Sequence, residues 1–98
     1  PAADALKPLL GSFQVIEGRV RATAKIKGTV YLNFGADWRT DFTVTIEKAD
    51  VPLFADTDPL RLQGARIRVR GWLKDRNGPM IVATHPEQIE PVTDRRTP

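Results

Sequence analysis

Cysteine is absent from this chain of 98 residues, and histidine and serine occur only as His85 and Ser12. Without cysteine the chain forms neither a disulfide framework nor a thiolate metal site. The sequence is therefore compatible with both an oxidising and a reducing compartment. A zinc site needs several nitrogen or sulfur ligands, so we expect no metal and no cofactor. Nothing in the sequence pairs Ser12 with a base. We therefore predict that this chain carries no catalytic residues and is not itself an enzyme.

Long apolar runs are also missing, so no transmembrane helix is expected and no membrane partner is predicted. The size predicts one domain with one small core. The chain begins with Pro1 in place of Met, and we expect a processed or excised piece of a longer protein. A periplasmic or secreted location and a cytoplasmic one both stay open.

The strongest local signal is a hairpin over residues 64–84. Its first strand alternates apolar residues with large polar ones: Ile67, Val69, Gly71 and Leu73 against Arg66, Arg68, Arg70, Trp72 and Lys74. A period of two is typical of a half-buried strand, because successive side chains point to opposite faces. Asn77-Gly78 supplies the positive φ angles of a tight turn, and 80–84 is the return strand.

Three more strands precede this hairpin. Residues 13–26 read as one long strand with a bend at Gly18, and Val20, Ala22, Ala24 and Ile26 form its apolar face. Residues 29–34 and 40–48 alternate in the same way, the latter with Phe42, Val44 and Ile46 inside. Asp50 then precedes a proline near the first turn of a short predicted helix.

This order predicts an all-β protein, a small five-stranded barrel of the OB-fold type with a short helix between strands 3 and 4. An SH3-like barrel is the main competitor, but its helical turn would precede the last strand. We expect the OB-fold domain to span residues 13–90. A linker or short helical segment over 1–12 precedes it, and a flexible tail over 91–98 follows.

Several segments resemble one bacterial family. They are Val15-Ile16-Glu17-Gly18-Arg19-Val20, 29–35, Asp37-Trp38-Arg39-Thr40-Asp41-Phe42-Thr43-Val44, Val69-Arg70-Gly71-Trp72, 76–81 and Thr84-His85-Pro86-Glu87-Gln88-Ile89-Glu90. Together they look like the OB-type C-terminal region of thermonuclease-family proteins, those related to staphylococcal nuclease. The resemblance implies a linked upstream nuclease domain. The calcium-binding carboxylates and arginines of that nuclease have no counterpart here, so cleavage is not implied for this chain.

The predicted function is non-specific binding of single-stranded DNA or RNA as an accessory domain. An OB barrel usually presents strands 2 and 3 with the loops after strands 1 and 4, and aromatic rings there stack on bases. The predicted nucleic-acid-binding residues are Lys25, Lys27, Tyr31, Asn33, Trp38, Arg39, Arg68, Arg70, Trp72, Arg76 and Asn77. Asp41 on the same face argues mildly against phosphate contact.

Structural roles compete with these assignments. The basic strip over 66–76 is the footprint of a polyanion binder, and it is equally what blunts an exposed strand edge. Trp38 and Trp72 are each slightly more typical of packing residues than of stacking platforms. The alternative function is therefore a protein-interaction or oligomerisation module that packs against a linked nuclease domain. Such a chain would be a monomer or a weak oligomer. A barrel for a small ligand or an oligosaccharide is a third hypothesis, which no sequence feature favours.

Overall fold

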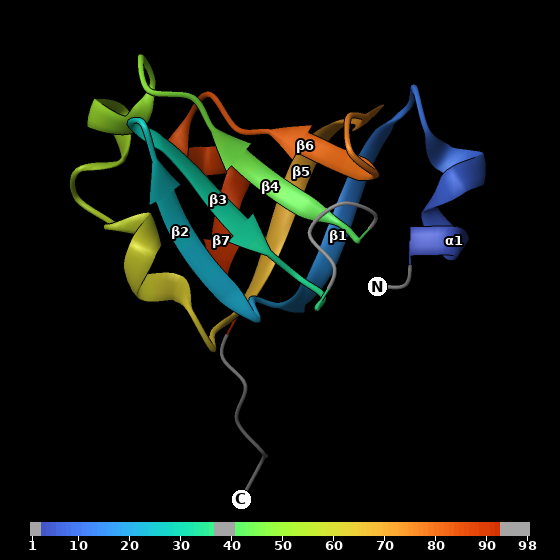
Figure 1. Cartoon of the computed structure of the whole chain (residues 1–98), viewed down its shortest axis with the longest axis horizontal. Coiled ribbons are helices and arrows are strands. Elements are labelled where there is room, and N and C mark those ends of the chain that lie inside the picture. The colour runs from blue at the N-terminus through green and yellow to red at the C-terminus, as the bar shows by residue number, and fades with distance from the viewer. Residues whose placement is uncertain (1–2, 37–40, 93–98) are drawn as a thin grey trace, which may run out of the picture.

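The computed structural model describes residues 3–36 and 41–92, which form mainly β-strands wrapped around one core (Figure 1). The strands are β1 (Phe13–Arg19), β2 (Ala22–Ile26), β3 (Thr29–Asn33), β4 (Thr43–Ile46), β5 (Arg66–Asp75), β6 (Pro79–Val82) and β7 (Ile89–Pro91). The helical segments are α1 (Ala3–Leu6) and four 3-10 helices, η1 (Lys7–Leu9), η2 (Val51–Phe54), η3 (Pro59–Leu62) and η4 (Pro86–Gln88). The all-β prediction is confirmed.

The strands pair in the order β1-β5-β6-β4-β3-β2, and β7 adds to β5. All neighbours are antiparallel except β4 and β6, which are parallel. The two ends of this path, β1 and β2, are consecutive in the chain. Hydrogen bonds tie their junction to both sides: Val20 N donates to Ala65 O, and Arg21 N donates to Asn33 O, each at 2.8 Å. The sheet therefore curls around the core.

The core is formed by every second residue of the strands, as the alternation predicts. Val30 and Leu32 of β3, with Val44 and Ile46 of β4, are almost fully buried. The predicted inner face of β5 is also buried: Ile67, Val69, Gly71 and Leu73. Phe42 is fully buried in this core, and the ring of Phe34, tilted against it with centroids 5.0 Å apart, packs on the core from outside. The inner faces of the β3, β4 and β5 predictions are therefore confirmed.

The prediction for the first strand is wrong in two respects. The break lies at residues 20–21 rather than at Gly18, which pairs with Ile67 inside β1. At this break the chain stops pairing with β5 and starts to pair with β3. The alternation of inward and outward side chains shifts by one residue there, so the alanines and the isoleucine of β2 point outward. Ala24 therefore lies across from Tyr31 on the outer face of the sheet, and Ile26 is 56% exposed.

The number of strands also differs from the prediction. The structure has seven strands where five were predicted, because the first is divided and β7 follows η4. The predicted helix after Asp50 is replaced by two short 3-10 helices, η2 and η3. Asp50 makes no side-chain cap, whereas the Asp58 carboxylate accepts a hydrogen bond from Leu60 N at 3.1 Å.

Candidate nucleic-acid interface

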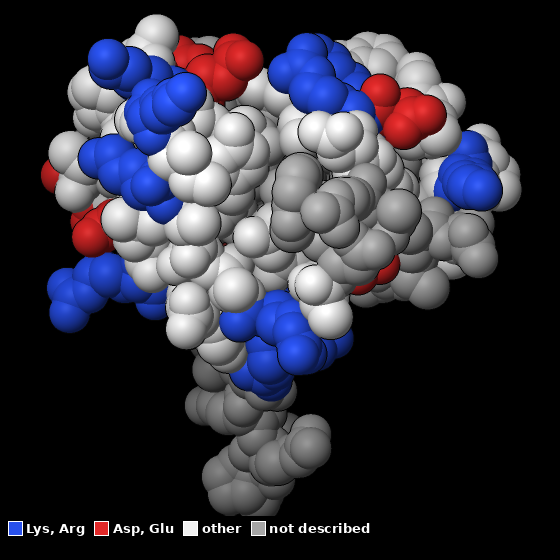
Figure 2. Space-filling view, viewed as in Figure 1, with Lys and Arg blue, Asp and Glu red and all other residues white. Residues whose placement is uncertain are grey.

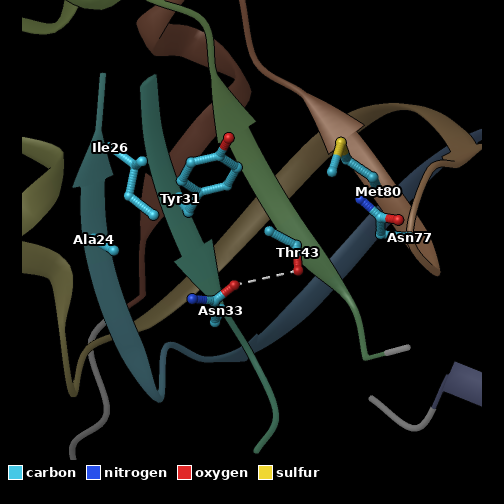
Figure 3. Close-up of a pocket in the computed structure, with 7 residues that line it drawn as sticks. All are labelled: Ala24, Ile26, Tyr31, Asn33, Thr43, Asn77 and Met80. Atoms are coloured by element: carbon cyan, nitrogen blue, oxygen red, sulfur yellow. Dashed lines mark hydrogen bonds between the residues drawn. The ribbon is translucent and has the colours of Figure 1, made fainter. Parts of the chain in front are cut away.

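A groove of about 350 Å³ lies on the outer face of the sheet. β2, β3, β4 and β6 contribute to it, together with the turn between β5 and β6, and it is lined by Ala24, Ile26, Tyr31, Asn33, Thr43, Asn77 and Met80 (Figure 3). Its floor exists because alternate residues of these neighbouring strands share one face: Ala24 is opposite Tyr31, Asn33 is opposite Thr43, and Thr43 is opposite Met80. Four strands thus bring their outward residues to one place.

One buried and one partly buried contact fix the floor of the groove. Thr45 Oγ1 donates to the sulfur of Met80 at 3.3 Å, and Thr43 Oγ1 donates to Asn33 Oδ1 at 3.4 Å. The second contact holds the Asn33 amide against β4, as Figure 3 shows. Among the described residues, neither the Tyr31 hydroxyl nor the Asn77 amide has a hydrogen-bond partner. The groove therefore combines an apolar floor with polar groups that can still bind a ligand.

The groove itself contains no charged residue among those that the structure describes. Figure 2 shows Lys and Arg side chains at the margins of this face, with some Asp and Glu side chains among them. Lys27 lies in the β2–β3 turn, and the stem of Lys48 lies so close to Gly28 that a Cβ there would be 2.8 Å from it. Arg76 lies in the β5–β6 turn, 3.9 Å from the Glu47 carboxylate in an exposed ion pair.

The two turns beside the groove each contain two consecutive residues with positive φ angles. Lys27 and Gly28 have φ angles of 51° and 87°, and Asn77 and Gly78 have φ angles of 54° and 88°. Two consecutive positive φ angles are what tight hairpin turns require. The Asn77-Gly78 turn is thus where the sequence predicts it.

Of the predicted binding residues, the structure brings Tyr31, Asn33 and Asn77 together in the groove. Lys27 and Arg76 lie in the flanking turns. Lys25 lies on the other face of β2, across from the buried Val30, because the alternation restarts at the strand break. Trp38 and Arg39 fall outside the described residues. The sequence reasoning does not predict Ala24, Ile26, Thr43, Met80 and Lys48 as site residues. Of these, only Thr43 could be found from the sequence, because the alternation over 40–48 places it on the outward face.

Arg68 and Arg70 lie away from the groove, on the outer face of β5. The Glu17 carboxylate of β1 accepts hydrogen bonds from Arg66 at 2.8 Å and Arg68 at 3.0 Å. The Glu90 carboxylate of β7 accepts one from Arg70 at 3.0 Å and a longer one from Arg68 at 3.5 Å. The predicted basic strip is therefore partly neutralised, and its pairs hold β1 and β7 onto β5.

These ion pairs also shift the carboxyl groups. Hydrogen bonds from Arg66 and then Arg68 hold the pKa of Glu17 below its ordinary value of 4.5. A hydrogen bond from Arg70 chiefly lowers the pKa of Glu90 in the same way. Opposite charge and hydrogen bonding both favour the ionised form. These carboxylates stay charged in neutral solution and continue to occupy the arginines.

Trp72 lies on the outer face of β5 beside this ion-pair network. It is 60% exposed, and its ring meets that of Phe13 edge-on, with centroids 5.8 Å apart and planes at 86°. The two residues are directly opposite in the register of β1 and β5. Val15 on the same face of β1 is also exposed, so this is a small apolar patch separate from the groove.

His85 and the residues after it form a structural loop. The Gln88 side-chain oxygen accepts hydrogen bonds from Thr84 N and His85 N, while its amide donates to Arg70 O at 3.1 Å. The His85 ring contacts the Thr84 hydroxyl at 3.0 Å. Within residues 3–36 and 41–92, no group of His, Cys, Asp and Glu could hold a metal ion. No helix in that part of the chain is long and apolar enough for a membrane span.

No protein-family model matches this chain, and no match was found among curated proteins. Among solved structures it is similar to an aspartyl tRNA synthetase from Entamoeba histolytica, with a TM-score of 0.62 and 14% sequence identity. The similarity covers 100% of this chain and 22% of the synthetase chain. At this identity the likeness shows a shared β-rich fold.

Proposed function

We propose that this chain is an OB-fold domain that binds single-stranded nucleic acid without sequence preference. The observation that carries the proposal is the position of the groove. In an OB barrel, β1 and β2 together count as the first strand, β3 and β4 as the second and third, and β5 and β6 as the last two. OB-folds bind oligonucleotides on the second and third strands, between the loops after the first and fourth. The groove occupies that position.

Charge supports the same assignment. Lys27 and Lys48 stand at the β2–β3 turn, and Arg76 stands at the β5–β6 turn. A single-stranded nucleic acid that crosses the groove can place its phosphates near these cations while its bases face Tyr31. Cationic margins around a stacking surface are typical of proteins that bind single strands. The solved synthetase structure with a similar fold carries tRNA in its name, which agrees with a nucleic-acid ligand.

Binding of a labelled single-stranded oligonucleotide, measured by fluorescence anisotropy over a range of salt concentrations, tests this function. We expect the affinity to fall as salt rises, because phosphate contacts release counterions. Lys27→Gly keeps the positive φ angle of the turn and removes one cation. The plot of log affinity against log salt concentration should become shallower by about 0.7 in slope for a single-stranded ligand. Lys25→Ala is the control, because Lys25 lies across from the buried Val30 on the face of β2 away from the groove. Absence of binding at low salt contradicts the proposal.

Protein docking is the second candidate function, and the exposed Phe13–Trp72 pair favours it. Exposed aromatic side chains are enriched at protein interfaces. The partner would be a linked domain, for which the expected relation to thermonuclease-family proteins stays a prediction, or a second copy of the chain. Light scattering over a range of concentrations, with Trp72→Ala as the comparison, tests self-association. A monomer at every concentration contradicts docking to a second copy of the chain.

A further inference from the structure

We propose that the groove holds one unstacked nucleobase as an uncharged ligand, and that the phosphates contribute nothing inside it. This inference rests on the proposed function and makes it more specific. The groove is lined by the Tyr31 ring, the aliphatic side chains of Ala24 and Ile26, and the Met80 side chain. Its polar groups are amides and hydroxyls from Asn33, Asn77 and Thr43. A phosphate inside the groove would meet no cation among these residues.

The shape and polarity fit a flat heterocycle. Tyr31 offers a ring face, and Met80 is a polarisable side chain held in place by Thr45. The Asn33 and Asn77 amides can each donate and accept hydrogen bonds, so together they match a base edge that carries both kinds of group. Because amides serve either role, several bases can satisfy them. This agrees with binding that does not depend on sequence.

An oligosaccharide fits the same groove less well. A sugar presents hydroxyl groups on most of its edges and needs many polar partners, whereas much of this lining is apolar. A buried hydroxyl without a partner costs binding free energy. The ratio of apolar to polar lining therefore favours a base over a sugar.

The test uses uncharged nucleosides, which carry a base without phosphate. The whole chain is titrated with uridine, thymidine, cytidine and adenosine while two-dimensional NMR spectra record the side-chain amides of Asn33 and Asn77 and the methyl group of Met80. We expect shifts at these groups with the same affinity at low and high salt. Tyr31→Ala should weaken nucleoside binding about tenfold, the scale of stacking one base on one ring. Tyr31→Phe should retain binding.

Trp72→Ala is the matched control, because it removes an aromatic ring from the outer face of β5 and should leave nucleoside binding unchanged. Circular dichroism establishes that each variant is folded. If the oligonucleotide binds but nucleosides leave the groove signals unchanged, the inference is overturned while the proposed function stands. If nucleosides shift those signals but an oligonucleotide does not bind, the inference stands and the proposed function fails. Stronger shifts with a neutral oligosaccharide also overturn the inference.

Discussion

Gln88 lies directly over Gly71. A Cβ on Gly71 would be 3.1 Å from Gln88 Nε2 and 2.7 Å from Ile81 Cγ2. The missing side chain lets the Gln88 amide reach Arg70 O, which fastens the segment of η4 and β7 to β5. The close approach explains why glycine interrupts the otherwise large residues of this strand.

Gly71→Ala should destabilise the fold by about 1–3 kcal/mol, the usual cost of adding a methyl group to a packed position. The added carbon would displace Ile81 from the core or Gln88 from its hydrogen bond. Urea unfolding measures the loss. Lys74→Ala, at an exposed position of the same strand, should change the unfolding midpoint little. Equal stability of the Gly71→Ala and wild-type chains would show that the two side chains can shift at no cost.

Gln88→Ala should also destabilise the chain, because it leaves Thr84 N and His85 N without their shared acceptor. A lost hydrogen bond costs about 1 kcal/mol, so a total of roughly 1–3 kcal/mol is expected. Gln88→Glu retains the acceptor oxygen and removes the amide that donates to Arg70 O. It should be the milder change. Hydrogen exchange of the β7 amides reports the same order, and a greater loss in Gln88→Glu than in Gln88→Ala contradicts it.

Stability should fall in acid because Glu17 and Glu90 are paired with arginines. Their pKa values are lower in the folded chain than the ordinary 4.5, so the unfolded chain takes up protons first as the pH falls. The stabilisation by these pairs is complete above pH 4.5 and is lost as the pH falls through the lowered values. Urea midpoints at a series of pH values measure this.

Glu90→Gln is the matched variant for the acid effect. The difference in stability between it and the wild-type chain should be largest above pH 4.5 and should disappear in more acidic solution. A difference that is independent of pH would mean that the Glu90 contacts act through packing rather than through charge.

Asn77→Gly should keep the stability of the chain, because glycine adopts the positive φ angle of 54° without strain. Asn77→Ala should cost about 1–2 kcal/mol, since a Cβ disfavours the left-handed region. Asn77→Asp tolerates the turn and adds a negative charge at the groove. It should weaken oligonucleotide binding at low salt, as measured by anisotropy, and an unchanged affinity would place the ligand elsewhere.

Most of the strands follow from local patterns. The alternation from Ile67 to Leu73 gives the buried face of β5 correctly, and Asn77-Gly78 gives its turn. The break in the first strand does not follow, because residues 20–21 turn where the chain changes its partner from β5 to β3. That change is set by pairing with distant residues, and Gly18 misleads because it is the obvious local bend. β7 is only three residues long and carries no pattern of its own.

The site is predictable only in part, for the same reason. Tyr31 and Asn33 follow from the outward period of β3. The sequence pattern predicts Ala24 and Ile26 on the inside, because no local signal marks the reversal of faces at residues 20–21. The sequence predicts free cations at Arg68 and Arg70, because their partners are distant along the chain. Glu17, for example, lies 51 residues from Arg68. Long-range pairing decides which charges remain available to a ligand.

The matching left-handed turns at Lys27-Gly28 and Asn77-Gly78 have a consequence for how quickly a ligand is captured. The β2–β3 turn has two residues between its last paired positions and the β5–β6 turn has three, and connections this short hold Lys27 and Arg76 close to the paired strands. Binding of a ligand therefore costs little conformational entropy of the protein. Association at the groove should accordingly be limited by encounter rather than by rearrangement of the protein.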